Sequence, residues 1–133
     1  EGATIATGGK RIERDGYFMA PTILCDVAPE SSIAQQEIFG PVLCVMAFDN
    51  NEEAIQIANN TEFGLVAGVF TKNLSVAHKS ANALKAGQVF VNEWYAGGVS
   101  TPFGGVGKSG FGREKGVEAF YNYVRTKNIA IKL

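Results

Sequence analysis

Short apolar runs alternate along this chain with segments whose apolar residues recur at helical spacing. The runs at residues 42–48 and 65–71 lack strict alternation, and residues 89–91 begin a third run. Runs of this kind are typical of strands covered on both faces of a parallel sheet, with helices as connections. The order strand, helix, strand, helix, strand therefore predicts an α/β fold, a parallel sheet with flanking helices. We expect the strand at residues 42–48 to be central.

Two helices are expected between these strands. Asn50 precedes Glu53 by three residues, which is the spacing of a capping box, and helical spacing follows up to Asn60. The second helix presents an apolar face made of Leu74, Ala77, Ala81 and Leu84. Nearer the N-terminus, a Gly8-Gly9 turn is expected to join residues 3–7 to residues 11–13 as a hairpin.

A further short helix with a sharp stop precedes the strand at residues 42–48. Ser32 and Gln35 have capping-box spacing, and Gly40 followed by Pro41 must end the helix. Glu37 then lies near the helix end, where a carboxylate is able to accept two hydrogen bonds from a vicinal diol such as that of ribose. An ordinary solvated glutamate is the alternative.

The C-terminal third predicts a loop, a helix and a final strand. Residues 97–116 contain eight glycines and are expected to be irregular. Helical spacing resumes over residues 117–124, after which Ile129, Ile131 and Leu133 alternate with other residues. An apolar strand at a chain end exposes unpaired backbone groups, so we expect residues 127–133 to pair with another subunit.

Size and charge exclude several classes of protein. The chain has 133 residues, 46% of them hydrophobic, and a formal net charge of -1. This composition is not that of a disordered chain, and there is no basic cluster for nucleic acid. No run approaches the length of a membrane span. We therefore expect a soluble protein, of one domain or part of one, and a first residue other than Met suggests a fragment.

The cysteines and the histidine do not form a recognisable catalytic or metal-binding pattern. Cys25 and Cys44 lie in apolar runs, which favours core packing in a reducing compartment, and hence the cytoplasm, over a disulfide or a nucleophile. His78 is the only histidine and is expected at a surface or boundary position of its helix. The sequence contains no zinc-ligand spacing, so no metal site is predicted.

The glycine-rich loop contains two sequence patterns typical of phosphate-binding loops. Neither pattern has the neighbouring residues and elements that such a loop requires. Residues 105–110 match G-x-G-x-x-G and end in the GKS of a P-loop. The stretch does not directly follow a strand, however, and Pro102 stands where a P-loop needs glycine. A loop shaped by close packing is the favoured interpretation. Trp94, Tyr95 and Phe103 flank it and either wall an apolar pocket or fill core beneath it.

Several motifs in a fixed order together resemble the aldehyde dehydrogenase superfamily. They are EIFGPV at 37–42, ANN at 58–60, GL at 64–65, VN at 91–92, PFGG at 102–105 and SGFGRE at 109–114. The resemblance extends over about residues 16–133, and its motifs are specific in combination although each is weak alone. It implies the C-terminal part, residues 1–126, of the catalytic domain of an enzyme that oxidises aldehydes to carboxylic acids with NAD or NADP.

The resemblance also assigns roles in cofactor binding. It implies that Glu37 holds the hydroxyls of the nicotinamide ribose, that Phe39 packs against the nicotinamide, and that Leu65 lines the same pocket. The family's catalytic cysteine and glutamate match nothing in this chain and would lie upstream of Glu1. This chain alone is therefore expected to be inactive, and its contribution is to position cofactor and substrate.

Substrate binding and assembly are implied in the same way. Phe103 would be an aromatic wall of the aldehyde tunnel, with Tyr95 and Gly97 also facing it. Many relatives carry a bulky aromatic residue where this chain has Gly97, so we expect a substrate bulkier than acetaldehyde. Residues 127–133 would extend a sheet between subunits of a dimer or tetramer. The alternative is a stand-alone, non-catalytic binding or assembly module with the same fold.

Overall fold

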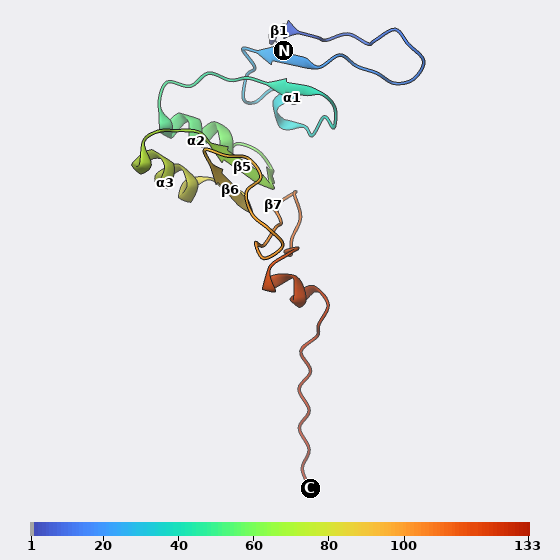
Figure 1. The fold of residues 1–133 in the computed structure, drawn as a ribbon, viewed down its shortest axis with the longest axis vertical. Helices are drawn as coiled ribbons and strands as arrows, with labels where there is room; N and C mark the ends of the chain where they lie inside the picture. Colours follow the sequence, from blue (N-terminus) through green and yellow to red (C-terminus); the bar gives the residue numbers. More distant parts are fainter. Residues whose placement is uncertain (1) are drawn as a thin grey trace. The chain divides into compact units, whose positions relative to one another are not determined.

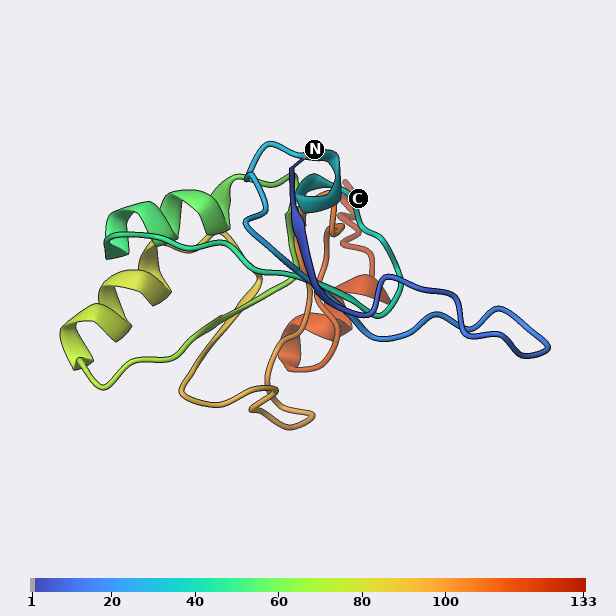
Figure 2. The same ribbon diagram turned by 90° about the horizontal axis from the view of Figure 1, so that it is seen from above.

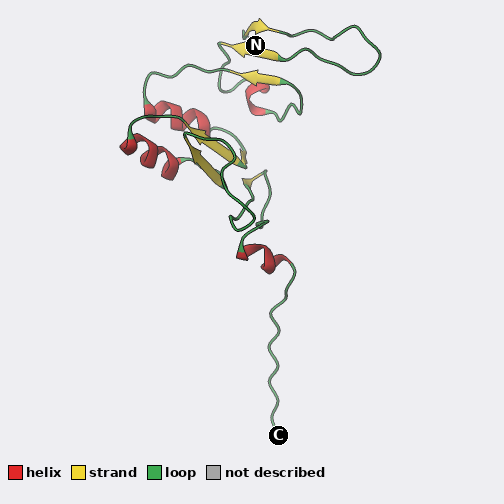
Figure 3. Ribbon diagram, viewed as in Figure 1, coloured by secondary structure: helices red, strands yellow, loops and turns green. Residues whose placement is uncertain are grey.

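The computed structural model describes residues 2–133 and divides the chain into two compact units. The first unit ends at Asn60 and the second begins at Thr61. Strands and helices occur in both units, which confirms the α/β class (Figure 3). None of the helices within residues 2–133 is long and apolar enough to cross a membrane.

A three-stranded mixed sheet forms the frame of the first unit. Its order is β1 (Thr4–Thr7), β2 (Thr22–Cys25) and β3 (Val42–Cys44). β2 pairs with β1 in the antiparallel direction and with β3 in the parallel direction. The prediction of a central strand at residues 42–48 is wrong, because β1 occupies the other side of β2 and leaves β3 at the edge. Leu43 is accordingly 58% exposed.

The predicted Gly8-Gly9 hairpin is also wrong, because the partner of β1 is β2. Residues 8–21 form a long loop that extends away from the two strands in both views (Figures 1 and 2). The base of this loop is held by Thr22, which is buried and whose Oγ1 accepts a hydrogen bond from the Gly9 N–H at 2.8 Å. A tertiary contact therefore replaces the local turn.

In the first unit, one helix has its predicted cap, whereas the other begins next to the predicted position and has no side-chain cap. α2 (Asn51–Asn59) begins at an Asn50 cap, whose side chain accepts from the Glu53 N–H at 2.9 Å. α1 (Ser32–Gln35) instead begins after Ser31 and has no side-chain cap. It ends at Gln35, well before Gly40, because Gln36 has an extended backbone, and the Gln35 amide donates to the carbonyl oxygens of Pro29 and Asn60.

The second unit contains a parallel strand pair covered by a helix. β5 (Val66–Val69) and β6 (Gln88–Val91) are parallel, with Val66 opposite Gln88. α3 (Leu74–Ala83) connects them and packs on both, burying Ala77 and Ser80. This unit confirms a predicted strand, helix, strand segment. Leu74 is exposed, however, so the predicted apolar face is buried only in part.

The glycine-rich loop adds a small antiparallel pair to the second unit. β4 (Phe63–Gly64) pairs with β7 (Val106–Gly107). With β1 paired antiparallel as well, the predicted single parallel sheet is replaced by three small sheets of mixed direction among the described residues. Among the described strands, only β2 with β3 and β5 with β6 run parallel. The sequence patterns identified most strands but not their partners.

The chain ends in a 3-10 helix and an extended segment. η1 (Val117–Asn122) stands where helical spacing predicts a helix. Residues 124–133 have no assigned helix or strand and are drawn as an extended loop in Figure 3. Within residues 2–133 this segment joins no sheet, so the intersubunit strand at residues 127–133 stays a prediction.

Few apolar side chains are buried within the described residues. The buried apolar residues are Val27, Ala77 and Phe90, and no described side chain is less than 2% exposed. Large apolar side chains are exposed throughout residues 2–133, from Ile5 to Leu133. Monomeric proteins rarely expose apolar surface on this scale, and larger exposed apolar patches typically mark interaction sites.

Candidate functional site

A narrow cleft in the second unit brings together the three residues predicted to face a substrate. Tyr95, Gly97 and Phe103 all line it, together with Gln88, Thr101 and Lys115. We call it the Tyr95–Phe103 cleft. Three aromatic residues, an amide, a hydroxyl and an ammonium group therefore surround one small space of about 10 Å³, which is about the size of a single water molecule.

Phe103 is fixed in the cleft by its backbone. Its N–H donates to the Glu114 carbonyl oxygen at 2.7 Å, and the Glu114 N–H donates back at 2.6 Å. The Gln88 side chain donates to the carbonyl oxygen of Pro102 at 2.8 Å and so ties the same segment to β6. The ring of Phe103 is half-buried. A rigid aromatic wall, as the resemblance implies, is consistent with these contacts.

Tyr95 and Gly97 are held in backbone conformations that are unusual for most residues. Tyr95 has a φ of 64° and a side chain that is 63% exposed. Gly97 has a φ of 117°, and a Cβ at this position would lie 3.0 Å from the Thr101 Oγ1. The backbone conformation at position 97 therefore favours glycine, in addition to any effect of the missing side chain on the cleft.

Trp94 does not line this cleft. Its ring meets the buried ring of Phe90 edge to face, with centroids 5.9 Å apart. It also covers Gly68, where a Cβ would lie 2.8 Å from the indole. The sequence left open whether the aromatic residues around the loop pack in the core or line a pocket. Trp94 packs on its neighbours, whereas Tyr95 and Phe103 line the cleft.

Lys115 is a cleft residue that sequence reasoning missed. Its ammonium lies 5.4 Å from the centroid of the Tyr95 ring and 5.5 Å from that of Phe103. Cation–π attraction acts within about 6 Å, so both rings contribute weakly. The only signal in the sequence is the position of Lys115 next to Gly116, and nothing local predicts that its side chain reaches two rings.

The residues predicted to bind the cofactor occupy exposed positions. Glu37 follows α1 and is exposed, and within residues 2–133 no hydrogen bond or ion pair holds its carboxylate. Phe39 has a φ of 55° and a ring that is 92% exposed. A bulky residue in the left-handed region is strained, and such strain persists where the surroundings or a function require it. Leu65 lies in the second unit between β4 and β5 and is 40% exposed.

The phosphate-binding patterns of the glycine-rich loop are used for packing. The ammonium of Lys108 pairs with the Glu62 carboxylate, and the Lys108 N–H donates to the Glu62 carbonyl oxygen at 2.7 Å. The Ser109 Oγ accepts from the Gly64 N–H at 3.0 Å. Both side chains that a P-loop would direct at a phosphate are thus engaged, Lys108 by Glu62 and Ser109 by the Gly64 backbone of β4.

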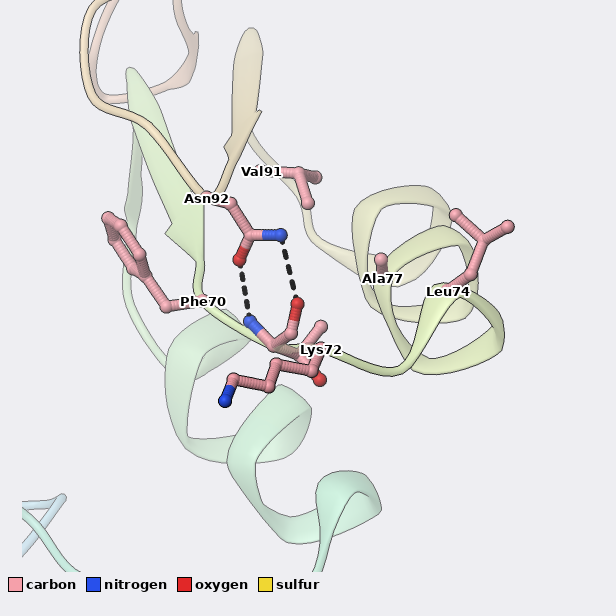
Figure 4. Close-up of a pocket in the computed structure, with 7 residues that line it drawn as sticks. Phe70, Lys72, Leu74, Ala77, Val91 and Asn92 are labelled. Atoms are coloured by element: carbon pink, nitrogen blue, oxygen red, sulfur yellow. Dashed lines mark hydrogen bonds between the residues drawn. The ribbon is translucent and has the colours of Figure 1, made fainter.

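An apolar hollow of about 680 Å³ lies at the carboxyl ends of β5 and β6. Phe70, Leu74, Ala77 and Val91 line it, as Figure 4 shows. Asn92 closes one side through two hydrogen bonds with the Thr71 backbone, at 2.8 and 2.9 Å. None of the residues predicted to bind cofactor or substrate lines this hollow.

The remaining candidates show no catalytic arrangement. Cys25 and Cys44 are free and half-buried on β2 and β3, and the Cys44 thiol points to the Ile33 carbonyl oxygen at 3.7 Å. His78 is exposed on α3, as predicted. Across residues 2–133 the structure gathers no group of three or more His, Cys, Asp or Glu side chains suited to a metal ion.

Comparison with known proteins gives one consistent result. The model of the aldehyde dehydrogenase family matches residues 1–129. An aldehyde dehydrogenase of Emericella nidulans is 47% identical over 132 residues, which are 99% of this chain and 27% of the relative. The chain therefore spans about a quarter of the length of such relatives.

Solved structures agree with this match. A mutant of the P. syringae indole-3-acetaldehyde dehydrogenase AldA, in complex with NAD+ and IAA, has a TM-score of 0.92 at 51% identity. That comparison covers 99% of this chain and 27% of the other. An NAD+ complex of an aldehyde dehydrogenase from Bacillus cereus has a TM-score of 0.87 at 48% identity and covers 92% of this chain and 25% of that chain.

Proposed function

This chain belongs to the aldehyde dehydrogenase family, and from that premise we propose that it is the C-terminal part of an enzyme that oxidises an aldehyde to a carboxylic acid with NAD or NADP. The observation that carries the proposal is the convergence of Tyr95, Gly97 and Phe103 on one cleft. The resemblance to the family assigns the same three residues to the substrate tunnel, and their position in one cleft supports that assignment.

The exposed apolar surface supports the placement within a longer protein. The described residues bury Val27, Ala77 and Phe90 but leave most large apolar side chains exposed. At about 25 cal/mol per Å² of apolar area, covering such side chains stabilises the assembly that covers them. In our proposal the rest of the same enzyme and neighbouring subunits provide that cover, with residues 127–133 pairing between subunits of a dimer or tetramer.

The cofactor-binding role is assigned to Glu37, Phe39 and Leu65. Glu37 is exposed without a competing partner among the described residues, so its two oxygens are available to the two hydroxyls of a ribose. The exposed ring of Phe39 provides an apolar surface for an aromatic ring system. The nicotinamide, when bound, would accept hydride from the substrate. The residues of this chain fit its ribose end, and NAD occurs in the similar solved structures.

Phe103, Tyr95 and Gly97 would position the aldehyde. In our proposal, Gly97, which stands where many relatives carry a bulky aromatic residue, widens the tunnel of the full-length enzyme for a substrate larger than acetaldehyde. The nucleophilic cysteine and the glutamate that activates water are assigned to sequence before Glu1. This chain thus orients both reactants while the rest of the enzyme carries out the chemistry.

The proposal is tested with the full-length protein that contains this chain. We expect NADH or NADPH formation, followed at 340 nm, with hexanal or benzaldehyde as substrate, and none from residues 1–133 alone. Failure of the full-length protein to reduce either cofactor with any aldehyde would contradict the proposal. That result would favour the non-catalytic binding or assembly module.

A further inference from the structure

We infer that Gln35 is a positioning residue, which sets the place of the Glu37 carboxylate by holding the end of α1 against the end of α2. The inference rests on the proposed role of Glu37 in binding the nicotinamide ribose, and it adds a residue that acts through Glu37 rather than on the cofactor. It follows from the contacts of Gln35, from a second contact made by Asn60, and from the way the chain is held on both sides of Glu37.

The half-buried Gln35 side chain bridges two carbonyl oxygens. Its Nε2 donates to the Pro29 carbonyl oxygen at 2.6 Å and to the Asn60 carbonyl oxygen, also at 2.6 Å. The first contact joins the end of α1 to the turn that precedes it, whereas the second reaches a residue 25 positions along the chain. A side-chain amide nitrogen has two N–H donors, so both are used, and the site requires a donor at this position.

Asn60 contacts the surroundings of α1 at a second point. This residue is the C-cap of α2, and its Nδ2 donates to the Glu30 Oε1 at 2.7 Å. The turn that contains Glu30 is held in turn by the buried Ser31, whose Oγ donates to the Ala28 carbonyl oxygen at 2.7 Å. Asn60 therefore binds the chain both before and after α1. We call the contacts of Asn60 with Glu30 and Gln35 the Gln35–Asn60 clamp.

Glu37 lies on a short arch, residues 36–41, between the clamp and the first sheet. At the clamp end, the N–H of the first arch residue donates to the Ser32 carbonyl oxygen at 3.0 Å. At the sheet end, the Pro41 carbonyl oxygen accepts from the Thr22 N–H at 2.8 Å. The residues between these two bonds are exposed. The place of the Glu37 carboxylate therefore depends on how firmly each end of the arch is held.

The two ends of the arch differ in their support. At the sheet end, Thr22 is buried, and β2 is paired on both sides, with β1 and with β3. At the clamp end, α1 is a helix of four residues with no side-chain cap and no buried residue. Because a helix this short is not stable by itself, contacts outside it must hold it in place. Removing the Gln35 amide should therefore release the clamp end and leave the sheet end unchanged.

A released clamp end weakens cofactor binding through Glu37. The carboxylate has to present two oxygens to the two hydroxyls of a ribose, which requires a fixed direction. A segment that moves in the free protein must be ordered when the ligand binds, and this ordering lowers the affinity. Gln35 thus contributes to binding of the nicotinamide end, although its own donors are used by the backbone.

The test measures binding of NAD+ and of ADP to the full-length enzyme by titration calorimetry. ADP lacks the nicotinamide ribose, so it reports on the rest of the cofactor site. The variants are Gln35→Met, which removes the donors, Gln35→Lys, which keeps donors but has no acceptor, and Glu37→Gln, alone and combined with Gln35→Met. The control is Gln56→Met, which changes an exposed glutamine on α2 outside the clamp.

Loss of ordinary hydrogen bonds predicts a Kd for NAD+ that rises about threefold to tenfold in Gln35→Met, with a Kd for ADP that stays within about twofold. Gln35→Lys should bind NAD+ as the wild type does, because an ammonium is able to donate to both carbonyl oxygens. Gln56→Met should also match the wild type. The double variant should bind NAD+ no more weakly than Glu37→Gln alone, because Gln35 acts through Glu37.

Three results would overturn the inference while leaving the proposed function intact. In the first, Glu37→Gln weakens NAD+ binding but Gln35→Met does not. In the second, Gln35→Met weakens NAD+ and ADP equally, or adds its full effect to that of Glu37→Gln, which would assign Gln35 to general stability. In the third, Gln35→Lys binds NAD+ as weakly as Gln35→Met. Unchanged NAD+ binding in Glu37→Gln would instead contradict the proposed role of Glu37 and the inference together.

Discussion

Gly87 is the position at which a single methyl group should do most damage to the loop that carries the cleft. A Cβ there would overlap the Gly104 carbonyl oxygen, with the carbonyl carbon 2.7 Å away and the Cα of Gly105 3.2 Å away. All three atoms are backbone, so the chain itself must move. The Gly87 N–H also donates to the Gly64 carbonyl oxygen at 3.0 Å, and this bond joins β4 to the start of β6.

The expected cost of Gly87→Ala follows from this overlap. Added methyl groups in packed sites typically cost about 1–3 kcal/mol. Since about 1.4 kcal/mol corresponds to a tenfold change in an equilibrium constant, local opening around Gly87 should become about 5 to 150 times more frequent. Hydrogen–deuterium exchange measures that opening directly, without requiring the whole enzyme to unfold in one step.

The assay compares the peptide covering residues 85–92 in the full-length wild type and variants by mass spectrometry. Gly98→Ala is the matched control, since a Cβ at Gly98 meets nothing within 4 Å and neither glycine has a left-handed φ. Exchange should accelerate in Gly87→Ala and stay unchanged in Gly98→Ala. Equal exchange in the two variants would refute the packing argument for this loop.

Three further predictions concern separate parts of the chain. Asn50→Ala removes the α2 cap and should destabilise that helix by about 0.5–2 kcal/mol, seen as faster exchange in residues 51–59, whereas Asn50→Ser should not. The full-length enzyme should show a higher kcat/KM for hexanal than for acetaldehyde because Gly97 leaves room, and a clear preference for acetaldehyde would contradict this. Deletion of residues 127–133 should shift the enzyme to smaller species in size exclusion, and an unchanged elution volume would count against the intersubunit strand.

Features governed by neighbours in sequence were predictable. The Asn50 cap lies where its three-residue spacing to Glu53 places it, because both partners belong to one helical turn. The same rule failed at Ser32, where the Gln35 side chain is drawn to the carbonyl oxygens of Pro29 and Asn60. A remote acceptor such as Asn60 has no signature in the local pattern.

Strand pairing was the least predictable part of the fold. The apolar pattern of residues 42–48 indicated a strand but not its neighbours, and β3 proved to be an edge strand because β1 covers the far side of β2. Pairing partners are set by contacts between distant segments, which periodicity does not encode.

The cleft was predictable only in part. Tyr95, Gly97 and Phe103 were assigned through family motifs, and the structure brings them together. Lys115 could not be found in that way, because its position beside the cleft depends on the turn at Gly116 and on where two rings lie. The sequence near Lys115 does not show that its ammonium lies at a cleft, because that position depends on how the whole loop folds.

Binding of NAD+ to a Glu37→Gln variant tests the central claim most directly. Titration calorimetry on the full-length enzyme would compare wild type, Glu37→Gln and Glu13→Gln, the last being an exposed glutamate on the loop between β1 and β2. Loss of hydrogen bonds to a charged acceptor predicts a Kd for NAD+ that rises about tenfold or more in Glu37→Gln, with no change in Glu13→Gln. An unchanged Kd in Glu37→Gln would contradict the assignment of this carboxylate to the nicotinamide ribose.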